Sequence, residues 1–571
     1  MNRPAAPVEP RPRPSAPWPW ILLGGLIMTA ATPPSWWPGA ELLMLPGLAI
    51  WFALVTAERR PVLASYWLGA LHVAAFSWSL RHVTWFGWIA VGALGGCYYA
   101  AVALATRTAF RPDRAHRPVA AFALAVAGCC VLRAEMPGIG YPHGQPIHAF
   151  WAWPQWLGAV RLGGEVLGNA LLAALAAASV QLVRAWRLAV PTLPRARATF
   201  ASVAVVGAVA TFMFAPSPRG ERGATVAIAA IEPGYHSLDA FADVENASRA
   251  AYQRRWLELC RTRLVAPTEA VAGRGVASPP ALVLWPESSV PWSVRRSVDG
   301  EPSFEAMRGA FALQPSVRVL LGAAIEHREG GFTPAAVLVD ADGRYLGHHE
   351  KQRLVPGGES LPLVDWLPAG LAAAVRDFAA TNVGIPDARP GRALPPLRLE
   401  PTNGSREPGF GFAGLICYDN AFPEVVADAV GAGAQFLAVL SNEAWYRGGA
   451  EREQLVAITV LLAIATETPI VRCTSDGLSM AVDGDGSVLA TLAPAPAPQP
   501  AARVLRVDLP LGTGRLSPMA WSHRWLSLLA AVWLAIVLAH LALMWGKVLR
   551  SRRFLSAAVG ARGSGDPRGG S

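Results

Sequence analysis

Three residues with complementary chemistry stand near the ends of predicted strands: Glu287, Lys351 and Cys417. Glu287 follows the apolar run Ala281–Trp285 and a proline, and Cys417 directly follows the run Phe410–Ile416. A carboxylate can take the thiol proton, a thiolate can attack a carbonyl carbon, and an ammonium group can stabilise the oxyanion that forms. The set therefore predicts a nucleophilic cysteine whose base and oxyanion donor come from two other strand ends.

The surroundings of Cys417 favour a reactive thiol. A helical pattern opens at Pro423, which places the thiol near a helix N-terminus, where backbone N–H groups and the helix dipole lower a cysteine pKa. The backbone N–H of Tyr418, just past the predicted nucleophile, is a candidate second oxyanion donor. The alternative is a small buried hydrophobic residue. Glu287 and Lys351, each typical of a surface charge when considered alone, together favour the nucleophile.

The region from residue 221 to 510 alternates short apolar runs with charged, helix-like stretches, which predicts an α/β sandwich with a mixed sheet. Two Asp-Gly turns, within 340–343 and 483–486, predict hairpins. The predicted strands are Val226–Ile231, Ala281–Trp285, Val317–Gly322, Ala335–Val339, Phe410–Ile416, Phe436–Leu440, Ile470–Arg472 and Leu478–Val482. The predicted helices are Asp239–Val265, Ser303–Leu313, Pro423–Ala432 and Glu451–Thr466.

The composition indicates that part of the chain lies in lipid. The 571 residues are 53% hydrophobic and 16% charged, whereas soluble proteins average roughly 25% charged residues. The net charge of +10 comes from basic residues at the ends of apolar segments, not from one basic stripe, so we expect no nucleic-acid partner. The six cysteines show no metal-type pairing, and we assign no metal or cofactor.

Eight apolar segments predict a membrane bundle of about eight spans. They are Trp18–Thr32, Leu42–Ala57, Val62–Leu80, Val83–Thr106, Val119–Ala134, Val166–Val183, Ala198–Ala215 and Trp525–Trp545. Basic residues follow the second, fourth, sixth and eighth segments, so the positive-inside rule places both termini in the cytoplasm and the region between the last two spans outside. A cleaved signal peptide at the N-terminus is an alternative that leaves the later spans in the same orientation.

The predicted division of the chain follows from these segments. It consists of a disordered cytoplasmic N-terminus at 1–17, a seven-span bundle at 18–216, an α/β domain at 221–510, a last transmembrane helix at 520–546 and a basic cytoplasmic tail at 547–571. The outward loop Pro137–Trp156 is rich in aromatic residues and histidine, which favours an interfacial aromatic belt over a substrate-contacting loop.

Taken together, the motifs resemble those of the nitrilase superfamily, whose members share an α-β-β-α sandwich and a Glu-Lys-Cys triad. The matching pieces are Trp285-Pro286-Glu287, Glu350-Lys351 with Leu354-Val355-Pro356 and Glu359, and Ile416-Cys417-Tyr418 followed by Phe422-Pro423-Glu424. Ser441–Tyr446 resembles the Asn-Asp-Ala-Trp-Phe motif of the apolipoprotein N-acyltransferase branch. Members of that branch are eight-span membrane proteins with the nitrilase domain outside, between spans seven and eight.

The resemblance implies an acyl transfer in two steps on the outer face of the bacterial cytoplasmic (inner) membrane. Cys417 would take an acyl chain from a phospholipid as a thioester, and the α-amino group of an apolipoprotein's N-terminal diacylglyceryl cysteine would then accept it. Glu287 would be the base, Lys351 the oxyanion stabiliser and Glu359 a second carboxylate that orients Lys351 or the amine. Further supporting positions would be Tyr418, Asp419, Glu443 and Trp445.

Several positions depart from the branch's pattern. Asp419 stands where Glu is usual, Glu443 where Asp is usual, and Gly357 where Phe is usual, while Leu462–Ala465 replaces an expected Arg-Ala-x-Glu. These departures bear on substrate choice and activity. The alternatives are therefore a membrane-tethered amidase, an acyltransferase of the same fold with another acceptor, or a catalytically degenerate homologue that acts as a scaffold.

Overall fold

The computed structural model describes residues 17–108, 116–136, 138–216, 224–235, 248–273, 275–290, 293–296, 302–303, 317–327, 331–382, 388–399, 409–492, 501–516, 524–539 and 542–543. Outside these ranges lie the predicted tail 547–571 and, but for one end residue each, the predicted N-terminal segment 1–17 and helix Ser303–Leu313. The predicted domain boundaries stay predictions.

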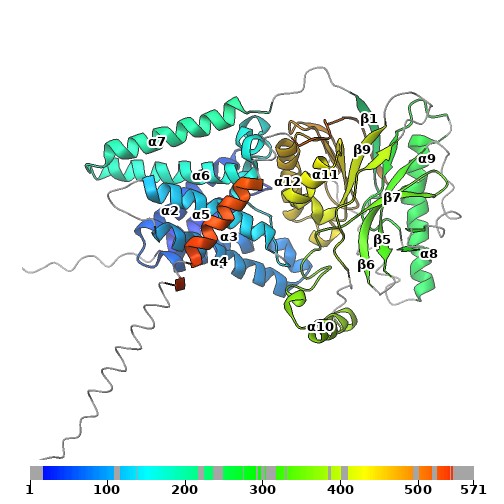
Figure 1. Ribbon diagram of the computed structural model, residues 1–571, viewed down its shortest axis with the longest axis horizontal. Helices are drawn as coiled ribbons and strands as arrows, with labels where there is room; N and C mark the ends of the chain where they lie inside the picture. The colour runs from blue at the N-terminus through cyan, green and yellow to red at the C-terminus, as the bar shows by residue number, and fades with distance from the viewer. Residues whose placement is uncertain are drawn as a thin grey trace, which may run out of the picture.

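The N-terminal part is a bundle of apolar helices, which the helix Arg524–Ala539 joins from the far end of the chain (Figure 1). Five helices are long and apolar enough to cross a membrane, and three shorter apolar helices accompany them within the described ranges. The helices are α1 Trp18–Ala31, α2 Met44–Ala57, α3 Pro61–Phe76, α4 Trp85–Thr108, α5 His116–Glu135, α6 Gly158–Arg187 and α7 Leu193–Ala208. Large apolar side chains such as Phe86 are exposed on the outside of the bundle, as in a membrane helical region.

The C-terminal part holds two mixed β-sheets, packed face to face. In the first sheet the strand order is β14-β1-β2-β5-β3-β4, with β6 paired to β5 and β7. The order in the second sheet is β13-β12-β11-β10-β9-β8. The first sheet contains β1 Thr225–Glu232, β2 Leu282–Leu284, β3 Ser293–Arg296, β4 Pro302–Ser303, β5 Val319–Glu326, β6 Phe332–Val339, β7 Tyr345–Glu350 and β14 Arg503–Pro510. The second contains β8 Leu397–Leu399, β9 Phe410–Ile416, β10 Phe436–Ser441, β11 Ile470–Thr474, β12 Met480–Val482 and β13 Val488–Thr491.

Alternation along the strands divides the interior into layers. On β1, Ile228 and Ala230 pack with the second sheet, whereas Ala229 and Ile231 pack toward α8 Arg249–Cys260 and α9 Ala266–Ala272. The other face of the second sheet is covered by α11 Pro423–Gly431 and α12 Glu451–Thr466. This confirms the predicted α-β-β-α sandwich.

The α11–α12 layer also joins the sandwich to the bundle (Figure 1). Every residue of α12 except Arg452 and Glu453 is buried, and α12 packs against α6 and against the short helix η3 Pro146–Phe150. The apolar residues of α11 and α12 belong to the same continuous core as those of the bundle. The sandwich and the apolar bundle therefore share one core.

The loop between α5 and α6 was predicted to form an interfacial aromatic belt, but the histidines at its centre are buried. Its His143 and His148 are only 1% and 0% exposed. They are buried because Arg133 donates a hydrogen bond to the carbonyl of His143 and Asn169 receives one from the N–H of Ile147, which ties the loop to α5 and α6. The centre of the loop thus lies inside the protein, between the bundle and the sandwich.

Candidate active site

Cys417 stands at the turn where β9 ends and η9 (Cys417–Ala421) begins. Its φ of +47° lies in the left-handed region, which is rare for a residue with a side chain and is found mainly where the surrounding structure enforces it. A carboxylate oxygen of Asp419 accepts a hydrogen bond from the N–H of Ile416 (3.3 Å) and so helps to close this turn. The thiol is buried and belongs to the core between the two sheets.

Lys351 directly follows β7 and lies between two carboxylates. Its Nζ donates hydrogen bonds to Glu287 Oε1 at 3.1 Å and to Glu359 Oε1 at 2.7 Å. The lysine side chain is 1% exposed, while those of Glu287 and Glu359 are 12% and 20% exposed. Glu359 is itself anchored, since its Oε2 accepts the N–H of Val355 at 2.8 Å. The structure thus brings together the predicted base, oxyanion donor and second carboxylate.

Glu287 is positioned by backbone groups from both sheets. Its Oε2 accepts the N–H of Asn442, just past β10, at 3.0 Å. The turn that carries Glu287 passes close to β5, because a Cβ at Gly322 would lie only 2.5 Å from the Glu287 Cα. Gly322 therefore permits the approach that places this carboxylate between the sheets.

The burial of Cys417 favours its neutral thiol, which is the opposite of the lowered pKa that the sequence predicted. Burial, and then the nearby Glu287 charge, raise the pKa of Cys417, and these effects outweigh the opposing effect of Lys351. Burial also raises the pKa of Glu287, although Lys351 opposes that rise. Burial lowers the pKa of Lys351, but Glu287 and Glu359 raise it by more, so it lies well above its usual value. The thiol consequently needs a base, and Glu287 is suited to be one.

Asp419 connects the nucleophile turn to the lysine turn. Besides Ile416, it accepts the N–H groups of Gln352 (3.0 Å) and Arg353 (2.8 Å), the two residues after Lys351. Burial raises the pKa of Asp419 to about 7, although Lys351 and these N–H groups act in the opposite direction. This one carboxylate therefore fixes the position of Lys351 relative to Cys417.

The remaining predicted residues lie around this centre. The Tyr418 hydroxyl donates to the carbonyl of Gly140 at 2.8 Å, so its side chain reaches the α5–α6 loop. Glu443 is fully buried and pairs with Arg472 of β11. Trp445 lies in η10 (Ala444–Tyr446) with its side chain 48% exposed.

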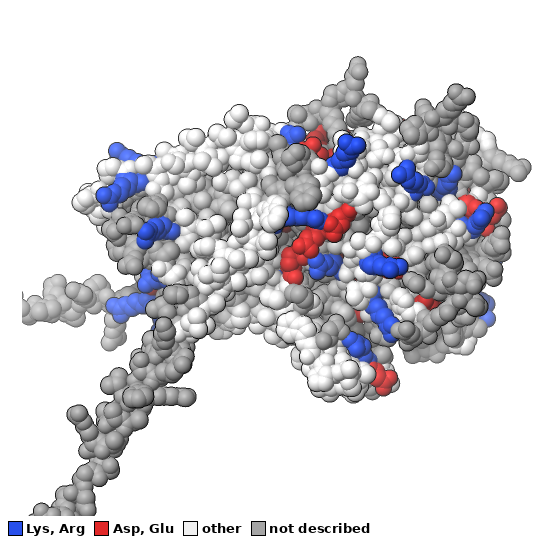
Figure 2. All heavy atoms as spheres, in the orientation of Figure 1, with Lys and Arg blue, Asp and Glu red and all other residues white. Residues whose placement is uncertain are grey.

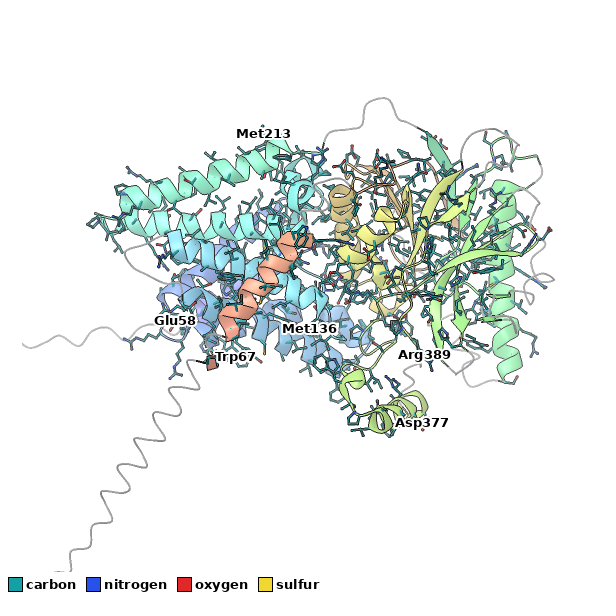
Figure 3. The ribbon with its side chains drawn as sticks, viewed as in Figure 1. Glu58, Trp67, Met136, Met213, Asp377 and Arg389 are labelled. Atoms are coloured by element: carbon teal, nitrogen blue, oxygen red, sulfur yellow. The ribbon has the colours of Figure 1, made fainter. Side chains whose placement is uncertain are left out.

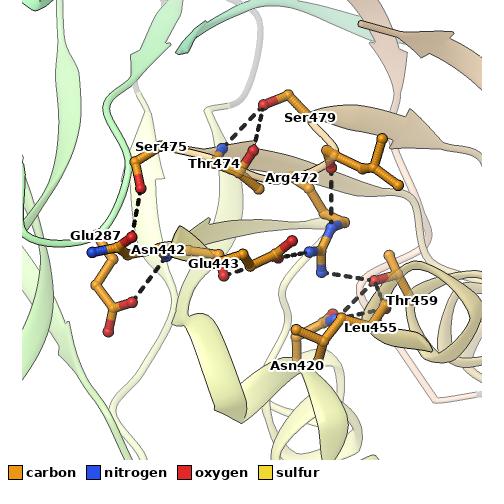
Figure 4. Close-up of polar contacts among 12 residues, drawn as sticks. Glu287, Asn420, Asn442, Glu443, Leu455, Thr459, Arg472, Thr474, Ser475 and Ser479 are labelled. Carbon is orange, nitrogen blue, oxygen red and sulfur yellow. Dashed lines mark hydrogen bonds and ion pairs between the residues drawn. The ribbon is translucent and has the colours of Figure 1, made fainter. Parts of the chain in front are cut away.

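Arg472 was not among the residues predicted from the sequence, and Figure 4 shows that its guanidinium bonds Glu443 and Thr459. An arginine in the middle of the apolar run Ile470–Thr474 was itself a signal, because a charge inside a buried strand requires a buried partner. Ser441 and Asn442 were quoted only as part of a motif. Asn442 holds Glu287, and a hydrogen bond from Ser441 favours the Cys417 thiolate.

Charged side chains also meet where the sandwich joins the bundle (Figure 2). Arg353 pairs with Glu135 at the end of α5 (2.9 Å) and with Glu424 at the start of α11 (3.2 Å). Asp428 of α11 pairs with Arg524 of the helix Arg524–Ala539. Within the described ranges, no group of three or more His, Cys, Asp or Glu side chains is placed to hold a metal ion.

Comparisons with known proteins agree with this arrangement. A family model described as carbon-nitrogen hydrolase matches residues 225–515. Similar relatives bear the name apolipoprotein N-acyltransferase. That of Geobacter metallireducens is 27% identical over 239 residues, which cover 41% of this chain and 42% of that protein. That of Gloeobacter violaceus is 25% identical over 502 residues, which cover 81% of this chain and 82% of that protein.

The match to the first of these relatives spans less than half of its length. Among solved structures, an amidase from Nesterenkonia sp. is 20% identical, with a TM-score of 0.32, and the match covers 53% of this chain and 97% of that chain.

Proposed function

Because the chain belongs to the carbon-nitrogen hydrolase family, we propose that it is a membrane enzyme that transfers a fatty acyl chain from a phospholipid to an apolipoprotein. The names of the relatives, apolipoprotein N-acyltransferase, support an apolipoprotein as the acceptor. The accepting group in this proposal is the α-amino group of its N-terminal diacylglyceryl cysteine. The observation that carries the proposal is the buried Lys351 between Glu287 and Glu359, in a sandwich that shares its core with an apolar bundle.

In the first half-reaction, Glu287 takes the proton of Cys417 and the thiolate attacks the ester carbonyl of the phospholipid. Lys351 Nζ and the N–H of Tyr418 stabilise the oxyanion. When the intermediate collapses, the lysophospholipid alkoxide leaves with the proton from Glu287, and the acyl chain stays on Cys417 as a thioester. The raised pKa of Glu287 suits this proton shuttle, because its carboxyl can both hold and release the proton.

In the second half-reaction, the α-amino group of the acceptor attacks the thioester carbon. Glu287 takes a proton from the amine and returns it to the departing Cys417 sulfur, which leaves an amide on the acceptor and the thiol on the enzyme. Glu359 holds Lys351 in place through both steps, because its second oxygen is fixed by the N–H of Val355.

The bacterial cytoplasmic (inner) membrane, with the sandwich on its outer face, suits both lipid substrates. Basic residues gather at the end of the bundle that lies away from the sandwich (Figure 2). Glu58, which follows α2, marks that end in Figure 3. By the positive-inside rule, we expect this basic end of the bundle to lie in the cytoplasm. The sandwich lies at the opposite end, which supports an extracytoplasmic location for it.

The test uses purified full-length protein in phospholipid vesicles with a synthetic diacylglyceryl-cysteine peptide. We expect the peptide to gain one acyl chain on its α-amino group, detected by mass spectrometry. Cys417→Ala protein should give no product. An acetylated peptide, in which the amine is blocked, is the matched control and should stay unchanged. Wild-type protein that becomes acylated but never transfers the chain to the peptide would reject this acceptor.

A further inference from the structure

A buried polar network extends from the end of β10 to β11 and α12, and Figure 4 shows its contacts around Glu443 and Arg472. Its members Ser441, Glu443 and Arg472 are 1%, 0% and 0% exposed. Charged side chains are almost never buried to this extent unless they are paired, and here Glu443 and Arg472 are buried together as an ion pair. Glu443 and Arg472 do not take part in the two half-reactions described above.

Arg472 is held at several points. Its guanidinium donates to Glu443 Oε1, to Thr459 Oγ1 on α12 (3.1 Å) and to the carbonyl of Leu478 (3.4 Å). A Cβ at Gly477 would lie 2.2 Å from Glu443 Oε2, so the absence of a side chain there makes room for the carboxylate. The position of Glu443 Oε1 is consequently fixed by the arginine.

Ser441 connects this pair to the nucleophile. In the parallel register of β9 and β10, Ile416 is the partner of Leu440. The next residues along the chain are Cys417, just past β9, and Ser441, the last residue of β10. The Ser441 hydroxyl donates to Glu443 Oε1 at 3.1 Å, and it lies within hydrogen-bonding reach of Cys417, where donation to the sulfur would favour the thiolate. A hydroxyl has one proton, so it can donate to only one of these two groups at a time.

We propose that the Ser441 hydroxyl donates to Glu443 while Cys417 is a thiol, and turns to donate to the sulfur when the thiolate forms. Arg472 makes this exchange possible, because it continues to bond Glu443 Oε1 after the hydroxyl has turned away. Ser441 is then a group that touches the reacting sulfur, and Glu443 and Arg472 are positioning residues. The inference rests on the proposed role of Cys417 as the nucleophile.

The first test measures how the rate of Cys417 alkylation by iodoacetamide depends on pH, in full-length protein without substrate. Labelling is quantified on the peptide that contains Cys417. We expect Ser441→Ala to raise the midpoint of the profile by about one to two pH units, because a hydrogen bond to a charged group is lost. The matched control is Ser479→Ala, which removes a buried hydroxyl bonded to Thr474 and should leave the midpoint unchanged.

The second test asks whether Arg472 acts through Ser441. Arg472→Lys keeps the charge but loses the fork that holds Glu443, so Glu443 should retain the Ser441 proton more strongly and the midpoint should rise. The same change in a Ser441→Ala background should cause no further shift. Equal shifts in both backgrounds, or a wild-type midpoint in Ser441→Ala protein, would overturn the inference. Alkylation of Cys417 needs no lipid, so this test does not depend on acyl transfer. If the variants show the expected midpoint shifts but the wild-type protein transfers no acyl chain, only the proposed function is rejected.

Discussion

Two clusters of buried charge in the sandwich differ in charge balance and in access. Around Lys351, one cation faces two carboxylates whose side chains are 12% and 20% exposed. In the second cluster, the single carboxylate of Glu443 pairs with the single cation of Arg472, and both side chains are fully buried. A carboxylate in excess, within reach of substrate, can take up and release a proton. A sealed and balanced pair can only hold its neighbours in place. The comparison separates charges that we propose to react from charges that position.

The largest expected effect is on the rate of acyl-enzyme formation, and it comes from removing Lys351, the cation that lies between Glu287 and Glu359. Lys351→Met leaves Glu287 and Glu359 buried without their cation, so we expect acyl-enzyme formation to fall by about a thousandfold or more. The matched variant Lys351→Arg keeps the charge with a different shape and should recover stability more than rate. Rapid acylation by Lys351→Met, measured by quenched mass spectrometry, would remove the distinction between the clusters.

The sealed pair should respond to single and joint replacement in opposite ways. Arg472→Met leaves Glu443 unpaired and should lower the free energy of unfolding by about 3–5 kcal/mol. Glu443→Leu combined with Arg472→Met removes both charges and should restore most of that loss, as replacement of buried pairs by apolar residues often does. The measurement is chemical unfolding in detergent. A joint variant no more stable than the single one would show that the pair does more than balance charge.

Substitution of Asp419 tests how ionisation of a buried carboxylate, held by backbone N–H groups, changes the free energy of unfolding. Its folded pKa of about 7 lies above the unfolded value near 4, so its carboxyl costs stability as the pH rises from about 4 through 7. Asp419→Asn cannot ionise. The unfolding free energy of the variant relative to wild type should therefore increase over this range by roughly 3 kcal/mol or more. A difference that is constant with pH would contradict the raised pKa.

A smaller effect is expected at Glu359, which anchors the lysine but does not touch the sulfur in the proposed steps. Glu359→Gln keeps the shape and loses the charge-assisted hydrogen bond to Lys351, so we expect acylation to slow by roughly tenfold to a hundredfold. The pH dependence of the rate should keep its form, since Glu287 is still the base. A loss as large as that of Lys351→Met would assign Glu359 a direct chemical role.

The smallest effect is expected where the charges are most exposed. Arg353 pairs with Glu135 and Glu424, whose side chains are 24% and 59% exposed. Such pairs contribute about 1 kcal/mol or less each, so Arg353→Ala, which breaks two of them, should lower the free energy of unfolding by about 2 kcal/mol at most. Its backbone N–H, which bonds Asp419, is retained in the variant. A loss of several kcal/mol would show that this junction stabilises the whole domain.

Local sequence patterns predicted much of the framework. The bounds of the predicted strand Phe410–Ile416 and helix Glu451–Thr466 match β9 and α12, because apolar runs, Pro423 and turn residues are local signals. Glu287, Lys351 and Cys417 were found because polar residues at the ends of apolar strands have few structural explanations. The family and the sandwich followed from these pieces and are confirmed.

Long-range partners were beyond those patterns. β14 pairs with β1, although most of the domain's sequence lies between these two strands. The mixture of Arg503, Arg506 and Asp508 with apolar residues in β14 was not recognised as a strand. The pKa of Cys417 was predicted in the wrong direction, because proximity to a helix N-terminus is visible in sequence and depth of burial is not. The contacts of Asp419 with the residues after Lys351 depend in the same way on the folded chain.

A covalent acyl-enzyme at Cys417 is the central requirement of the proposed mechanism. The decisive measurement is the intact mass of full-length wild-type protein after incubation with phospholipid vesicles and no acceptor, followed by peptide mapping. We predict a mass increase of one fatty acyl group that is released by neutral hydroxylamine, maps to the peptide containing Cys417, and is absent from Cys417→Ala protein. Wild-type protein that never gains this adduct, or gains it equally in Cys417→Ala protein, would contradict the account.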